Sequence, residues 1–154
     1  MLRLIGSYNL AMTTALYNRD ILRLAASIPH HRRLERPQSS VEKRSPTCGS
    51  RVAIDVVLDG KGRLAGLGQE VRACALGQAA ASLMGASALG RSGVELAEAR
   101  DALAAFLEGR RDDPGGWPGL DIFGPARPYS ARHPSILLAF EAVAEAAALA
   151  KARR

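Results

Sequence analysis

The residues best suited to chemistry in this chain are its two cysteines, Cys48 and Cys74. Cys48 lies in the turn Pro-Thr-Cys-Gly, just before an alternating apolar run, and Cys74 lies just before a run with helical period. A cysteine thiolate is a nucleophile and a good ligand for zinc and iron. If the two thiolates are close together, they make half of a tetrahedral metal site; if they are apart, each is an ordinary small hydrophobic residue.

A predicted β-hairpin brings the two cysteines to one place. The alternation of apolar residues over 51–58 predicts a strand with one face buried, and Asp55 falls on the outer face, where we expect it to be solvated. The Asp-Gly-Lys-Gly sequence at 59–62 predicts a tight turn, and residues 64–71 then return as an antiparallel partner. Both cysteines stand about a dozen residues from this turn, so they lie at the same end of the hairpin. Cys74 also begins a helix, whose dipole and free amides favour a thiolate.

Helical periods on both sides of the hairpin complete the predicted fold. We expect a short edge strand at 39–44 and helices within 17–28, 75–89 and 92–108, with a last helix that begins at Ser135. Ser92 and Glu95 have the spacing of a capping box at a helix start. The segregation of strands from helices indicates an α+β fold: a small antiparallel β-sheet of about three strands with helices packed on it.

Composition and charge narrow the functional classes. The chain is 47% hydrophobic and 23% charged, which is typical of a globular domain, and no apolar run is long enough to span a bilayer. Residues 1–46 hold eight Arg or Lys against three acidic residues, which suits an acidic partner, but the few aromatic residues do not interleave with them. We therefore expect no nucleic acid and no membrane among the partners. A chain with two cysteines and no export signal is expected to be cytoplasmic.

The chain is expected to form one domain over residues 15–154, preceded by an N-terminal extension at 1–14. Met12 begins a more natural helical sequence than Met1 does, and both remain possible starts. No Ser-His-Asp set, phosphate-binding loop or paired carboxylates stand out, so we do not expect an enzyme.

The run from Ser45 to Met84 resembles the cluster-scaffold domain of the NifU-like family, which includes the IscU and SufU proteins and helps to assemble iron–sulfur clusters. The family has Pro-x-Cys-Gly-Asp before a strand hairpin and a cysteine at the start of the following helix, as "SPTCGS" and "VRACALGQAAASLM" have here. "LYNRDILRLAASIP" and "WPGLDIF" also resemble family segments, and the likeness covers roughly residues 15–145. It implies a SufE/NifU-like fold.

The resemblance also implies a site, and this chain departs from it. The family binds metal or cluster through three cysteines and an Asp; the first two cysteines correspond to Cys48 and Cys74, and Ser50 takes the place of the Asp. The third cysteine is missing, and its position is Pro134 or Ser135, depending on the alignment. His133 lies beside that position and is a possible metal ligand; the alternative is that it only caps the loop before a helix.

Three functions follow from these residues. The first is a scaffold-like protein that binds iron, zinc or an iron–sulfur cluster through Cys48 and Cys74 and works with a cysteine desulfurase and other assembly proteins. The second is a zinc-dependent sulfurtransferase that accepts sulfur on one of these cysteines. The third is a metal-free adaptor whose basic N-terminal half binds an acidic partner. The scaffold is expected to be a monomer or a cluster-bridged homodimer, since two chains together supply four thiolates.

Overall fold

The computed structural model describes residues 16–46 and 48–153. Its elements, in chain order, are α2 (Arg19–Ala25), β1 (Ser39–Arg44), β2 (Arg51–Leu58), β3 (Leu64–Arg72), α3 (Ala75–Ser87), α4 (Gly93–Leu107), the 3-10 helices η1 (Leu120–Ala126) and η2 (Ser130–Arg132), and α5 (His133–Ala152). The strands form one antiparallel sheet in the order β1-β2-β3. The predicted α+β class is thus confirmed, while the predicted extension at 1–14 lies outside the described residues.

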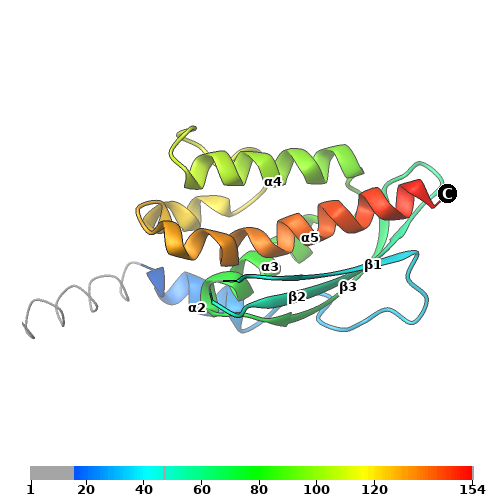
Figure 1. Ribbon diagram of the computed structural model, residues 1–154, viewed down its shortest axis with the longest axis horizontal. Coiled ribbons are helices and arrows are strands. Elements are labelled where there is room, and N and C mark those ends of the chain that lie inside the picture. Colours follow the sequence, from blue (N-terminus) through cyan, green and yellow to red (C-terminus); the bar gives the residue numbers. More distant parts are fainter. Residues whose placement is uncertain (1–15, 47, 154) are drawn as a thin grey trace, which may run out of the picture.

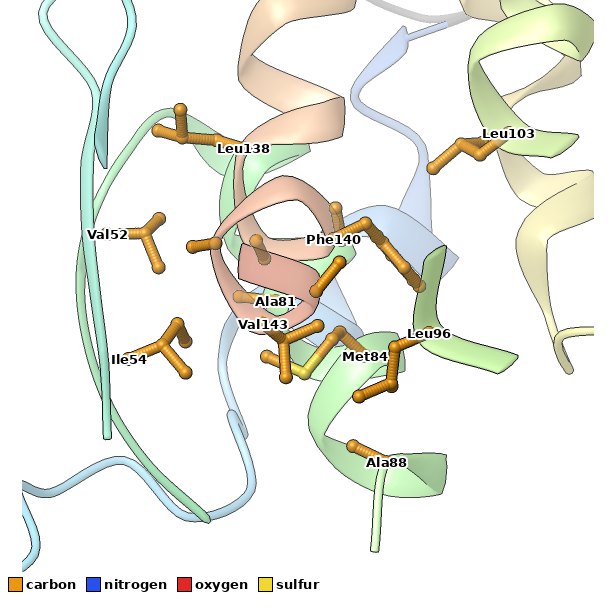
Figure 2. Close-up of a cluster of buried hydrophobic side chains, with 14 of the residues drawn as sticks. Val52, Ile54, Ala81, Met84, Ala88, Leu96, Leu103, Leu138, Phe140 and Val143 are labelled. Carbon is orange, nitrogen blue, oxygen red and sulfur yellow. The ribbon is translucent and has the colours of Figure 1, made fainter. Parts of the chain in front are cut away.

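The helices pack in layers on one face of the sheet. Figure 1 shows α5 running along the sheet, with α4 beyond it. Figure 2 shows how the layers meet: Val52 and Ile54 of β2 point toward Leu138 and Val143 of α5, and α3 and α4 close the far side of the cluster. The fold removes the apolar surface of these side chains from water, and this burial is the main contribution to its stability. Within the described ranges, no helix combines the length and the apolarity that crossing a membrane requires.

The predicted starts and stops of the elements are largely observed. The hairpin turns at 59–62, where the carboxylate of Asp59 accepts hydrogen bonds from the backbone N–H groups of Lys61 and Arg63. The capping box of α4 is present between Ser92 and Glu95. Helix α5 begins at His133, two residues before the predicted start, because a proline is tolerated in the first turn, where no backbone donor is required.

The prediction that Asp55 is solvated was wrong. The segment before β1 crosses the outer face of the sheet, and the His30 carbonyl accepts from the backbone N–H of Gln69 in β3. Asp55 is therefore fully buried and accepts two hydrogen bonds from Arg33, one from Ser40 and one from the backbone N–H of Leu34. Burial alone would raise the pKa of this carboxyl, but these bonds outweigh it and lower the pKa. Strand β2 is consequently buried on both faces.

Candidate metal centre

The two cysteines lie at the same end of the sheet, as the hairpin predicts. Arg51, the first residue of β2, pairs with Arg72, the last residue of β3. Cys48 stands three residues before that pair and Cys74 two residues after it. Cys74 is the N-cap residue of α3, so its thiol lies at the positive end of the helix dipole.

Two backbone hydrogen bonds join the ends of the loop that carries Cys48. The backbone N–H of Ser45 donates to the Ser50 carbonyl at 2.8 Å, and the N–H of Gly49 donates to the Ser45 carbonyl at 3.2 Å. Gly49 has φ +71°, a left-handed conformation that glycine adopts without strain. The Pro-x-Cys-Gly turn of the sequence is therefore a tight loop that presents an exposed Cys48 to solvent.

Two serine hydroxyls connect the two thiols. Cys48 Sγ lies 3.1 Å from Ser50 Oγ, Ser50 Oγ lies 3.1 Å from Ser135 Oγ, and Ser135 Oγ lies 3.2 Å from Cys74 Sγ. Both serines are buried, whereas Cys74 is partly exposed. Ser135, and not Pro134, is thus the residue of α5 whose side chain reaches the cysteines. It lies in the first turn of α5, so a second positive helix end points at the same place.

The contact between Ser135 and Cys74 depends on a glycine. A Cβ at Gly77 of α3 would lie 2.7 Å from Ser135 Oγ and 2.8 Å from Ala73 Cβ, closer than side-chain atoms can approach. The absence of a side chain at position 77 therefore lets α3 and α5 come together at their N-terminal ends.

The environment of Cys48 favours its ionised form. Burial disfavours the thiolate, but hydrogen bonds from Ser45, from the side chain and backbone of Ser50, and from Ser135 outweigh this effect and lower the pKa from 9.0 to about 7. Near neutral pH, Cys48 is therefore ionised to a greater extent than an ordinary thiol.

His133 does not join the two thiols. Its Nε2 lies 2.9 Å from the carbonyl oxygen of Ala126 at the end of η1. In the part of the chain that the structure describes, no three His, Cys, Asp or Glu side chains are placed together as a metal site requires. The hydrogen bonds instead join two thiols and two hydroxyls, those of Cys48, Ser50, Cys74 and Ser135, and these four side chains form the candidate site.

This arrangement has definite chemical capacities. Two thiolates can bind a thiophilic ion, and the neutral hydroxyls are weaker ligands than carboxylate or thiolate. A metal held here would keep coordination positions for other ligands. In addition, an exposed thiol that ionises near pH 7 can act as a nucleophile toward a disulfide or persulfide sulfur.

Ser45 and Ser135 are the residues whose contacts with the thiols the sequence did not predict. Ser135 was identified only as one possible position of a missing cysteine, because its contact with Cys74 joins two separate helices. Ser45 lies in the same short turn as Cys48, and a hydroxyl three residues before a cysteine in a Pro-Gly turn is a signal that could have indicated it.

The chain is similar to solved structures of two other proteins. The chain is 34% identical to the N-terminal part of a nitrogen-fixing NifU-like protein from Brucella abortus; the match covers 93% of this chain and 99% of that chain, with a TM-score of 0.86. It is also similar to a putative iron–sulfur cluster assembly scaffold protein for the SUF system from Fervidobacterium islandicum AW-1. That match has 20% identity, 88% and 98% coverage and a TM-score of 0.80, and at this identity it concerns the fold alone. No protein-family model and no curated protein matches the chain.

Proposed function

Because the chain belongs to the NifU-like family, we propose that it takes part in iron–sulfur cluster assembly and carries iron, zinc or an iron–sulfur cluster as cargo on Cys48 and Cys74. The observation that supports this most directly is the junction of the two thiols through Ser50 and Ser135 at one end of the sheet. The SUF-system neighbour is a putative iron–sulfur cluster assembly scaffold, which agrees with this role.

The protein's own residues prepare the site for a thiophilic cargo. Metal binding requires deprotonated thiols and releases their protons, so a thiol with a pKa of about 7 loses its proton at little cost near neutral pH. The N-terminal ends of α3 and α5 supply positive potential to the same place. Ser50 and Ser135 are neutral and occupy positions at which a carboxylate and a thiolate would bind a metal more tightly. We therefore expect weaker retention and faster exchange of cargo than four charged ligands would give.

His133 remains a proposed third ligand. To bind a metal through Nε2, its ring must give up the contact with the Ala126 carbonyl at 2.9 Å. If His133 serves, His133→Ala lowers the metal content of the protein; if it only caps the loop, the metal content of that variant equals that of the wild type.

Metal analysis of anaerobically purified protein tests the proposal. We expect zinc or iron in the wild-type protein and neither in the Cys48→Ala, Cys74→Ala double variant, because both thiolates are lost. Ser82→Ala is the matched control, since Ser82 is also buried but bonds to the Ser27 carbonyl, away from the cysteines. Equally low metal in the wild type and the double variant, after reconstitution with iron and sulfide, would refute the metal-binding role.

A second function is favoured by the exposure and lowered pKa of Cys48. In this alternative, the Cys48 thiolate attacks the terminal sulfur of a persulfide on a cysteine desulfurase. A new S–S bond forms on Cys48, the S–S bond of the donor breaks, and the donor cysteine leaves as a thiolate. Mass spectrometry after incubation with a desulfurase and cysteine should then show an added sulfur on Cys48. Iron binding without any added sulfur leaves the scaffold role alone. Absence of both supports the metal-free adaptor.

A further inference from the structure

A row of three arginines crosses the sheet beside the proposed site. The strand register pairs Arg44 of β1 with Arg51 of β2, and Arg51 with Arg72 of β3. Directly opposed residues of an antiparallel sheet point to the same face, with Cα atoms about 5 Å apart. The three guanidinium groups, hereafter the arginine row, therefore stand side by side at the end of the sheet that carries the cysteines.

The arginine row faces away from the helices. Lys43, the neighbour of Arg44 in β1, pairs with Glu145 of α5 and so marks the inner face. Alternation then places the arginine row on the outer face, with Asp55. The side chain of Arg44 is 70% exposed and that of Arg51 is 31% exposed. Arg72 is also exposed.

The charges of the arginine row are only partly neutralised. Glu42 accepts from Arg44 at 3.1 Å and lies 3.6 Å from Arg51. Within residues 16–46 and 48–153, Arg72 has no ion-pair partner. Three like charges placed directly opposite one another oppose sheet formation, and a single carboxylate shared by two of them leaves positive charge for an external anion.

The chain connects every member of the arginine row to the site. Arg44 is followed by Ser45, whose hydroxyl bonds to Cys48, and Arg51 is preceded by Ser50. Arg72 lies two residues before Cys74. A protein segment that binds to the arginine row therefore lies at the same end of the sheet as the two cysteines.

The surroundings of the arginine row indicate what kind of anion fits. The adjacent row of outer-face positions consists of Glu42, Ala53 and Glu70. The positive strip is therefore short and ends at the carboxylates of Glu42 and Glu70, so it fits a short anionic segment better than the long phosphate track of a nucleic acid. No aromatic side chain lies in either row to stack on a base. A few carboxylates on a polypeptide match this strip, because each guanidinium can bind a carboxylate in bidentate fashion.

We propose that the arginine row is the docking site for a short acidic segment of a protein partner that exchanges cargo with the cysteine site. This inference names the partner surface of that site and rests on the proposed function. It also relocates the electrostatic contact expected from the basic N-terminal half of the chain: Arg33 of that half is engaged by Asp55, and two members of the arginine row lie beyond residue 46.

Fluorescence anisotropy with a labelled octaglutamate peptide tests the proposal on metal-free, full-length protein. The triple variant Arg44→Gln, Arg51→Gln, Arg72→Gln should bind the peptide at least about tenfold more weakly than the wild type, with a shallower salt dependence. The matched control has the same change in net charge on α4 and the loop after it: Arg100→Gln, Arg110→Gln, Arg111→Gln. It should bind as the wild type does.

A single variant keeps the test decisive if the triple variant does not fold. Arg72→Gln removes an exposed arginine with no ion pair in the described chain and should weaken peptide binding about threefold. Three results overturn the proposal: equal weakening in the control, wild-type binding of octaglutamate no tighter than of octaglutamine, or tighter binding of an eight-nucleotide single strand through the same arginines. Because the assay contains no metal, a failure of metal binding is observed separately from a failure of docking.

Discussion

Removal of the Ser50 hydroxyl should shift the ionisation of Cys48 toward that of an ordinary thiol. Ser50 Oγ lies 3.1 Å from Cys48 Sγ, and this bond is one of those that bring the pKa down to about 7. A hydrogen bond contributes about 1 kcal/mol net, and one pKa unit corresponds to about 1.4 kcal/mol. Since the backbone N–H of Ser50 stays in place, Ser50→Ala should raise the pKa of Cys48 by about half a unit to one unit.

The assay is the rate of alkylation by iodoacetamide as a function of pH, in a Cys74→Ala background so that one thiol reacts. The midpoint of the profile is the correct readout. At pH 7, a rise of about 0.7 unit lowers the thiolate fraction about threefold, but the more basic thiolate is about twice as nucleophilic, so the rate at one pH changes little. Only the titration curve separates these two opposing effects.

Two further variants complete this experiment. Ser135→Ala should shift the midpoint less than Ser50→Ala, because the contribution of Ser135 to the lowered pKa is smaller. Ser82→Ala, which removes a hydroxyl bonded to the Ser27 carbonyl, should leave it unchanged. A midpoint in Ser50→Ala within about 0.2 unit of its parent would refute the conclusion that the Ser50 hydroxyl lowers the pKa of Cys48.

Three other predictions concern stability and the metal site. Asp55→Ala should lower the free energy of unfolding by about 2–4 kcal/mol in urea titrations at pH 7, and Asp55→Asn by less. The pKa of Asp55 is lower in the folded protein than in the unfolded chain, so its contribution to stability is complete above the unfolded pKa of about 4 and is lost as the pH falls through the folded pKa. An equal loss of stability in Asp55→Ala at pH 7 and at pH 2 would contradict this. Gly77→Ala should lower the free energy of unfolding by about 1–3 kcal/mol, because the added Cβ would lie 2.7 Å from Ser135 Oγ. Gly93→Ala should leave the free energy of unfolding unchanged, because the nearest atom to its added Cβ is 3.9 Å away. Thermal unfolding of the two variants compares these effects. Ser135→Cys should tighten zinc binding at least about tenfold in competition with a chromophoric chelator, while Ser82→Cys should not.

The substitution Ser135→Cys also distinguishes transfer of the cargo from its storage. If cargo is held only in transit, Ser135→Cys tightens binding but slows release to an apo-protein acceptor. If the chain stores its cargo, the same substitution improves retention with no loss of transfer. The distances to Ser50 Oγ and Cys74 Sγ, 3.1 and 3.2 Å, place position 135 where either effect is measurable.

The sequence by itself determined the elements and the meeting of the two cysteines. Alternation over 51–58, the Asp-Gly-Lys-Gly turn and the helical period after Cys74 are local patterns, and an antiparallel hairpin brings residues equally far from its turn to one end. The capping box of α4 is local in the same sense, because Ser92 and Glu95 are three residues apart.

Only the tertiary structure decided which groups surround the thiols. Ser135 reaches Ser50 and Cys74 because α5 and α3 pack with their N-terminal ends together, at a contact that Gly77 permits. Asp55 is buried because Arg33 and its segment cross a face that alternation alone assigns to water. The arginine row exists only once the register of three strands is known. Such contacts join residues that are far apart in the chain, and their geometry follows from packing, which no local period encodes.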